Sequence, residues 1–226
     1  MAQLTILERI AEKAVEANVK TTVESAQWFY NRVREIRFTD PRKLLRERVA
    51  VLHERDVRGR LRFLGRMFSF FYEPKTKATL SYYDRFPLVI PIRESGQSFW
   101  GLNLHYLSPR MRMLFLKQLA PFLVNPRGNL ASQQATEEDS LNPYDSTTRL
   151  RFTSWNVLHK SRLARFARPA IKRYERSHIR SRILEFTPQE WVMIAFLPTA
   201  RFVGARPGQV WDDSKAVSAA LGRGTF

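Results

Sequence analysis

The side chains that could perform catalysis are scattered along this sequence. Its four histidines, His53, His105, His159 and His178, lack the spacing of metal ligands, and the chain contains no cysteine that could complete a zinc site. An isolated histidine is more often a structural or surface residue than a ligand. We therefore predict no metal site.

The carboxylates are equally dispersed. Asp84 stands alone among aromatic residues, and Asp212 and Asp213 are neighbours whose side chains would point in different directions on a helix. A metal-dependent nuclease needs clustered carboxylates, and phosphate-binding loops and nucleophile elbows have glycine motifs that this sequence lacks. We predict no catalytic residue, no cofactor and no enzymatic activity; a nuclease is the least favoured alternative.

Basic side chains form the strongest pattern. Residues 149–182 contain eleven lysines and arginines and one acidic residue, Glu175. On a helix, Lys172, Arg176 and Arg180 would share one face, where their repulsion would favour a bound anion such as DNA phosphate. The predicted DNA contacts of this region are Arg162, Arg165, Arg168, Lys172, Arg173, Arg176, Arg180 and Arg182.

A second basic run extends from Arg32 to Arg66. Within it Arg58, Arg60 and Arg62 alternate, so they would lie on one face of a strand and add a second strip of phosphate contacts. For both runs, a solvated surface or a seam that docks on an acidic protein remains an alternative.

The overall charge points to a polyanionic partner. The 226 residues have a formal net charge of +17, and 29 of the 38 basic residues are arginine. Arginine binds phosphate with a planar fork of donors, which favours nucleic acid over a merely soluble surface. No apolar stretch is long enough to span a membrane, so we predict no membrane span.

Helical patterns dominate the first part of the chain. Apolar residues recur at helical spacing over 4–24 and 25–37, and Pro41 could begin a third helix over 41–54. From residue 57 the pattern changes to aromatic and β-branched runs that predict strands at 61–72, 87–92 and 98–106, with a turn at 94–97. Ser108-Pro109 then predicts the start of a helix over 108–123.

The remaining sequence is polar and then basic. Residues 125–147 are predicted to be a linker, followed by basic helices at 154–167 and 170–184, a compact aromatic segment at 189–198 and a helix at 211–221. The expected fold is α+β, with N-terminal helices (1–56), a central, small antiparallel β-barrel-like (SH3-like) unit (57–124), the linker, and a basic helical C-terminal region (148–226) packed on the β unit.

Aromatic residues alternate with polar ones near Tyr82, Tyr83, Phe99 and Trp100. Such rings can stack on unpaired bases, but a run of this kind more often forms the core of a small domain, and we expect core here. No sequence-reading motif is present, so binding should depend on the DNA backbone.

The middle of the chain resembles the DNA end protector family of T-even-type tailed phages. The resemblance is carried by FFYEPKTKATLSYYDRFPLVIPI and FWGLNLHYLSPRMRMLFL, and EWVMIAFLPTARFVGA and VWDDSK are also similar to that family. It implies sequence-independent binding and protection of the ends of a linear double-stranded genome. It also implies a place in the virion, delivery with the DNA into the host cytoplasm, and a role in completing the head.

Two function classes therefore remain open. The preferred one is a virion-associated protein that binds DNA ends and contacts other head, neck or tail proteins, and that resides in the host cytoplasm during assembly and after genome delivery. The alternative is a purely structural neck, baseplate or tail component that contacts other virion proteins and has no DNA affinity of its own.

Overall fold

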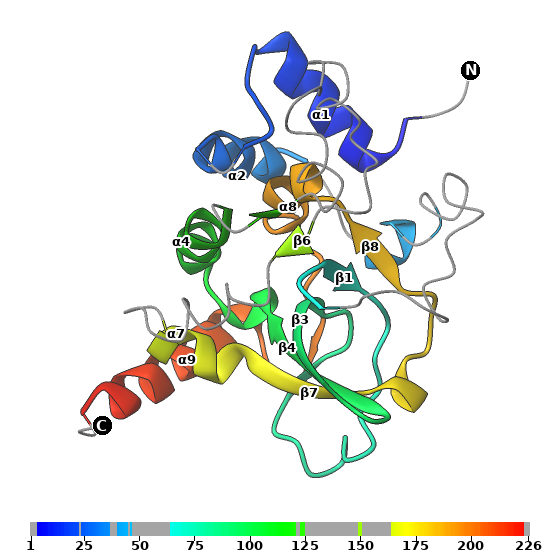
Figure 1. Cartoon of the computed structure of the whole chain (residues 1–226), viewed down its shortest axis with the longest axis vertical. Helices are drawn as coiled ribbons and strands as arrows, with labels where there is room; N and C mark the ends of the chain where they lie inside the picture. The colour runs from blue at the N-terminus through cyan, green and yellow to red at the C-terminus, as the bar shows by residue number, and fades with distance from the viewer. Residues whose placement is uncertain are drawn as a thin grey trace.

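A computed structural model of the chain describes residues 4–22, 24–36, 40–44, 46, 64–120, 123–124, 149–150 and 164–223. Helices surround one part of an antiparallel sheet, and the β3–β4 hairpin extends away from them (Figure 1). The predicted α+β class is confirmed at this level.

Two helices open the chain. Helix α1 (Ile6–Glu16) begins with a capping box in which Thr5 and Glu8 bind each other's backbone N–H groups. Helix α2 (Ala26–Arg34) follows, and residues 41–44 are helical as expected from Pro41. The helices predicted over 4–24 and 25–37 are thus confirmed, with shorter bounds.

The main sheet has five antiparallel strands in the order β7-β4-β3-β1-β8. Their bounds are β1 Met67–Ser69, β3 Leu88–Ser95, β4 Ser98–Asn103, β7 Ile171–Glu175 and β8 Leu184–Phe186. The sheet is open, so its two edges are β7 and β8, and the predicted barrel-like, SH3-like closure is not confirmed. The described residues also form two short strand pairs, β2 (Tyr83–Asp84) with β9 (Phe202–Val203) and β5 (Leu123–Val124) with β6 (Arg149–Leu150).

The hairpin of β3 and β4 matches the sequence closely. Ser95 pairs with Ser98 across a two-residue turn in which Gly96 has a φ of +54°, a conformation that glycine adopts at little cost. The strand predicted at 98–106 ends at Asn103 and continues as a 3₁₀ turn, η1 (Leu104–Tyr106).

The two faces of the sheet pack into different cores. One face contributes Leu88, Ile90 and Leu102 to a large cluster that also contains residues of α1, α2, α4, α8 and α9. The other face forms a small aromatic cluster of Phe68, Phe70, Tyr72, Val89, Phe99 and Tyr174. Helices from both ends of the chain thus share one core. The division into regions 1–56, 57–124, 125–147 and 148–226 stays a prediction.

The later helices begin at prolines. Helix α4 (Pro109–Leu119) begins after Ser108, α8 (Pro188–Ile194) after a capping box of Thr187 and Glu190, and α9 (Pro207–Arg223) at Pro207. Proline suits this position because its missing N–H would have no partner in the first helical turn. The predicted start of α4 is therefore correct, and α9 begins one turn earlier than expected; α8 lies in the segment for which only a compact aromatic stretch was predicted.

The predicted basic helix at 170–184 is wrong. This segment contains β7, a 3₁₀ turn η5 (Arg176–His178), an isolated bridge from Ile179 to Tyr72, and the start of β8. Ile171 pairs with Leu102 and Tyr174 with Phe99, so pairing with β4 and burial of Tyr174 outweigh the helical spacing of the apolar residues. Of the helix predicted at 154–167, only α7 (Ala164–Ala167) lies within the described residues.

Candidate nucleic-acid interface

The basic residues of the C-terminal region lie on the edge strand β7 and on the segments before and after it. We call Arg165, Arg168, Lys172, Arg173, Arg176, Arg180 and Arg182 the basic strip; it passes through α7, a 3₁₀ turn η4 (Arg168–Ala170), β7 and η5, and it ends in the segment between η5 and β8. Figure 1 shows this segment crossing the side of the molecule opposite α1. Lys172, Arg176 and Arg180 do not share a helix face, because Lys172 lies on β7, Arg176 in η5 and Arg180 beyond η5.

Six members of the basic strip are exposed, and Lys172 is not. Its Nζ lies 4.2 Å from the centre of the Tyr106 ring, and burial lowers the pKa of its ammonium group. Lys172 pairs with Gly101, one position away from Arg173 on β7, so the two side chains leave opposite faces of the sheet. The structure therefore separates Lys172 from the exposed arginines.

Two arginines of the basic strip have carboxylate partners. Arg176 Nη2 lies 2.8 Å from Glu94 Oε1, and Arg180 Nε lies 3.6 Å from Glu73 Oε2. All four side chains are at least a third exposed, and ion pairs at such positions contribute about 0–1 kcal/mol. A phosphate group could replace either carboxylate at small cost.

Arg165 and Arg173 have other partners. The guanidinium carbon of Arg165 lies 4.8 Å from the centre of the Phe166 ring, and Arg173 Nε donates to Ser98 Oγ at 3.1 Å. Both contacts leave positive charge at the surface. Arg162, Arg58, Arg60 and Arg62 lie outside the described residues, so their assignment to the interface stays a prediction.

The structure brings two further residues to the strip. Trp100 pairs with Arg173 on β7 and with Arg93 on β3, which places all three side chains on one face of the sheet. Arg93 was missed because the predicted strand ended at residue 92. If that strand is extended to Ser95, the turn that follows places Arg93 opposite Trp100, and this was the available signal. Phe99 is fully buried as expected, whereas Trp100 is 38% exposed.

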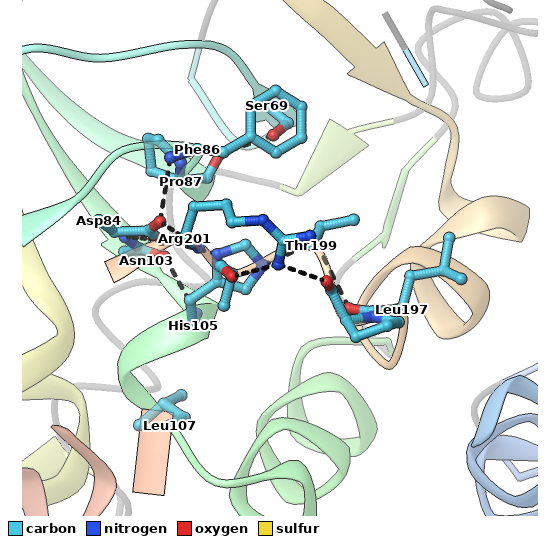
Figure 2. Close-up of polar contacts among 12 residues, drawn as sticks. Ser69, Asp84, Phe86, Pro87, Asn103, His105, Leu107, Leu197, Thr199 and Arg201 are labelled. Atoms are coloured by element: carbon cyan, nitrogen blue, oxygen red, sulfur yellow. Dashed lines mark hydrogen bonds and ion pairs between the residues drawn. The ribbon is translucent and has the colours of Figure 1, made fainter. Parts of the chain in front are cut away.

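A buried polar network holds this part of the sheet. His105 donates from Nδ1 to Asp84 Oδ2 at 2.6 Å, and its Nε2 lies 3.0 Å from Thr199 Oγ1. Asn103 Nδ2 donates to Asp84 Oδ2 and to the Tyr174 hydroxyl. Figure 2 shows Asp84, Asn103, His105 and Thr199 converging from strands and turns that are far apart in the sequence.

Asp84 is the centre of this network and is ionised. Burial raises the pKa of its carboxyl group, but the His105 and Asn103 side chains and the Phe86 N–H outweigh burial, and the pKa lies below its ordinary value. Burial lowers the pKa of His105 and outweighs the opposing effect of the Asp84 carboxylate, and the Arg112 and Arg201 cations also lower it. Neutral His105 then accepts a hydrogen bond from Thr199 at Nε2.

The network is structural rather than catalytic. Asp84, His105 and Thr199 are each at most 3% exposed, so no substrate reaches them in this arrangement. Their role is to join β2, β4, η1 and the segment after α8, and through Tyr174 they reach β7. The histidine and the aspartate were each interpreted as isolated in the sequence, and no local spacing shows that the fold would pair them.

Arg112 belongs to the interior and not to the basic surface. Its guanidinium donates to the carbonyl oxygens of Leu107, Ala195 and His105 at 2.9, 2.6 and 3.4 Å, and burial lowers its pKa to about 10. The side chain thus connects α4 to the end of α8 and to η1. Total charge alone does not identify which basic residues are available to a partner.

Over the part of the chain that the structure describes, no three His, Asp or Glu side chains are grouped as a metal ion would require. None of the helices described there combines the length and apolarity needed to cross a bilayer.

Comparison with known proteins gives one match. The family model described as phage T4 terminal DNA protecting protein matches residues 5–214. No curated protein and no solved structure matches the chain. The resemblance inferred from residues 67–107 is confirmed by the family match.

Proposed function

The chain belongs to the phage T4 terminal DNA protecting protein family, and we propose that it binds the ends of linear double-stranded DNA through the basic strip. Binding is independent of sequence, because arginines that contact phosphates carry no base information. A bound end is sterically closed to exonucleases. Protection in this scheme requires occupancy and no chemistry.

The observation that carries the proposal is the exposure of six arginines on β7 and on the segments before and after it, from α7 to the start of β8. Charged residues on an edge strand also discourage pairing with other chains, but five of the six exposed arginines lie outside β7. A series of guanidinium groups along an extended segment suits a phosphate backbone, which is itself a linear array of charges.

We further propose that the protein is virion-associated and takes part in completing the head. In that setting it contacts head, neck or tail proteins, and it enters the host cytoplasm with the DNA. The family description supports protection of phage DNA termini. A purely structural neck, baseplate or tail component is the competing class, and it predicts no affinity for isolated DNA.

The test compares retention of linear and covalently closed circular duplex of one sequence at 50–200 mM salt. If 6–10 phosphates are contacted, affinity should fall by about 10³–10⁵ over this range. Arg173→Glu with Arg182→Glu should weaken binding and reduce the salt slope by about 2, since each lost phosphate contact changes it by about 1. The matched control is Arg9→Glu with Lys13→Glu, on the exposed side of α1 at the opposite end of the molecule (Figure 1).

Exonuclease digestion of the linear duplex completes the test. We expect wild-type protein to protect the ends and the Arg173/Arg182 variant to lose protection, with the α1 control unaffected. Equal weakening by both double variants would assign binding to overall charge and not to the basic strip. Absence of affinity for any duplex would favour the purely structural class.

A further inference from the structure

Trp100 differs from the other tryptophans in the described part of the chain. Trp191 Nε1 donates to Phe186 O and Trp211 Nε1 to His105 O, while the Trp28 ring packs edge-on against Phe29. Within the described residues, Trp100 has no hydrogen bond at Nε1 and no contact with another ring or with a guanidinium group. It is 38% exposed, so this side chain presents an aromatic surface that no ring, cation or hydrogen-bonding group of the described residues occupies.

The sheet fixes the position of Trp100. The next residue, Gly101, lies against the Val89 side chain, and any Cβ at this position would collide with Val89 Cγ1. A β-bulge between Pro91 and Arg93 shifts the register of β3 beside it. Trp100 is therefore carried by a strand that is paired on both sides, and its backbone cannot move without disturbing the aromatic cluster.

Two arginines flank the ring. Arg93 and Arg173 are the cross-strand partners of Trp100 on β3 and β7, and their backbones are two strand spacings apart, about 9.5 Å. Ser98 Oγ accepts from Arg173 Nε and donates to Ser95 O, which directs that guanidinium along the face beside the ring. The result is an exposed aromatic side chain between two exposed cations.

On the basis of the proposed binding to DNA ends, we propose that Trp100 stacks on the terminal base pair of the duplex while Arg93 and Arg173 bind its last phosphates. Inside a duplex, both faces of each base pair are covered by neighbouring pairs. At an end, one face is open, and an aromatic side chain can stack on it whatever the base. Phosphate contacts alone cannot distinguish an end from the interior of the helix, so stacking supplies the discrimination that the basic strip lacks.

The test uses two duplexes of equal length and sequence, one with open blunt ends and one with both ends closed by hairpin loops. Wild-type protein should prefer the open duplex. Trp100→Ala should lower affinity for the open duplex about 5- to 20-fold, the lower part of the range for loss of one stacked base, and leave the closed duplex unchanged. Trp100→Phe should retain most of the preference, since phenylalanine can still stack.

The control is Leu114→Ala on α4, which removes an apolar side chain of similar exposure, 40%, from another surface.

A duplex with 2-aminopurine as its terminal base gives an independent readout. Its fluorescence should change on binding of wild-type protein and not of Trp100→Ala, whereas 2-aminopurine at the centre of the duplex should respond to neither. Thermal unfolding of each variant establishes that it is folded.

The outcomes separate this inference from the proposed function. If Trp100→Ala keeps the full preference for open ends, stacking by Trp100 is refuted while end binding stands. If wild-type protein binds both duplexes equally, end recognition itself fails, and the inference fails with it. Loss of preference in Trp100→Ala, with rescue by Trp100→Phe, supports the inference.

Discussion

Replacement of Asp84 by asparagine should destabilise the fold because the carboxylate accepts from four donors. Its Oδ1 accepts from the backbone N–H groups of Phe86 and Arg201 at 3.0 and 3.2 Å. Its Oδ2 accepts from Asn103 Nδ2 and His105 Nδ1 at 3.1 and 2.6 Å. An amide has the same shape but presents an NH₂ group to one of these two pairs of donors.

The expected loss follows from those contacts. Hydrogen bonds to a charged group contribute about 1.5–3 kcal/mol each, and two of the four face the new NH₂ group. His105 can exchange tautomers and the buried charge disappears, which returns part of the loss. We therefore expect Asp84→Asn to lower the free energy of unfolding by about 2–4 kcal/mol, a change that few single substitutions exceed.

Urea unfolding followed by tryptophan fluorescence measures this change. With a slope of about 2 kcal/mol per M, the midpoint should move by about 1–2 M. Asp212→Asn is the matched control, because Asp212 makes an exposed ion pair of 3.0 Å with Lys215 that contributes at most about 1 kcal/mol. Equal midpoint shifts for the two variants would refute the assignment of Asp84 as the centre of a stabilising network.

Two further predictions concern the same region. Because burial lowers the pKa of His105 below its ordinary value of 6.5, the unfolded chain binds a proton that the folded chain does not. The free energy of unfolding should thus fall as the pH falls below about 6.5. It should fall further in acid as Asp84 is protonated. Urea titrations between pH 5 and pH 8 measure the first decline, and its absence would contradict the neutral state of His105. Gly101→Ala should lower the free energy of unfolding by about 1–3 kcal/mol, because the added Cβ overpacks against Val89. Gly208→Ala in α9 is the control: no atom lies within 4 Å of its added Cβ, so it should be neutral or stabilising. Thermal melting compares the two variants, and similar melting temperatures would show that Val89 moves aside at little cost.

The local signals of the sequence predict the helix starts and the central hairpin correctly. Ser108-Pro109 begins α4, and Ser95 to Ser98 turn through Gly96 as expected. These features depend on a few neighbouring residues, whose backbone preferences are the same in any context. The same reasoning failed over 170–184, where Ile171 and Tyr174 have helical spacing but lie in a strand.

The structure shows that six of the predicted arginines are exposed, and their assignment to a DNA interface stays a prediction. Sequence reasoning included Lys172, which the fold turns toward Tyr106, and omitted Arg93, which the β3–β4 register places beside Trp100. Pairing across strands cannot be read from the spacing within one strand, because register depends on which partner the strand finds.

The sequence by itself determined the composition of this protein's surface chemistry: a large excess of arginine, no cysteine and a family likeness carried by residues 67–107. Only the tertiary structure decided that the arginines lie on an edge strand and the segments around it, that Trp100 lies exposed beside Arg173, and that Asp84, His105 and Thr199 form one buried network. The physical reason is that charge and turn propensity are local properties, whereas burial and strand pairing are set by contacts between distant segments, and those contacts outweigh the small conformational preferences of single residues.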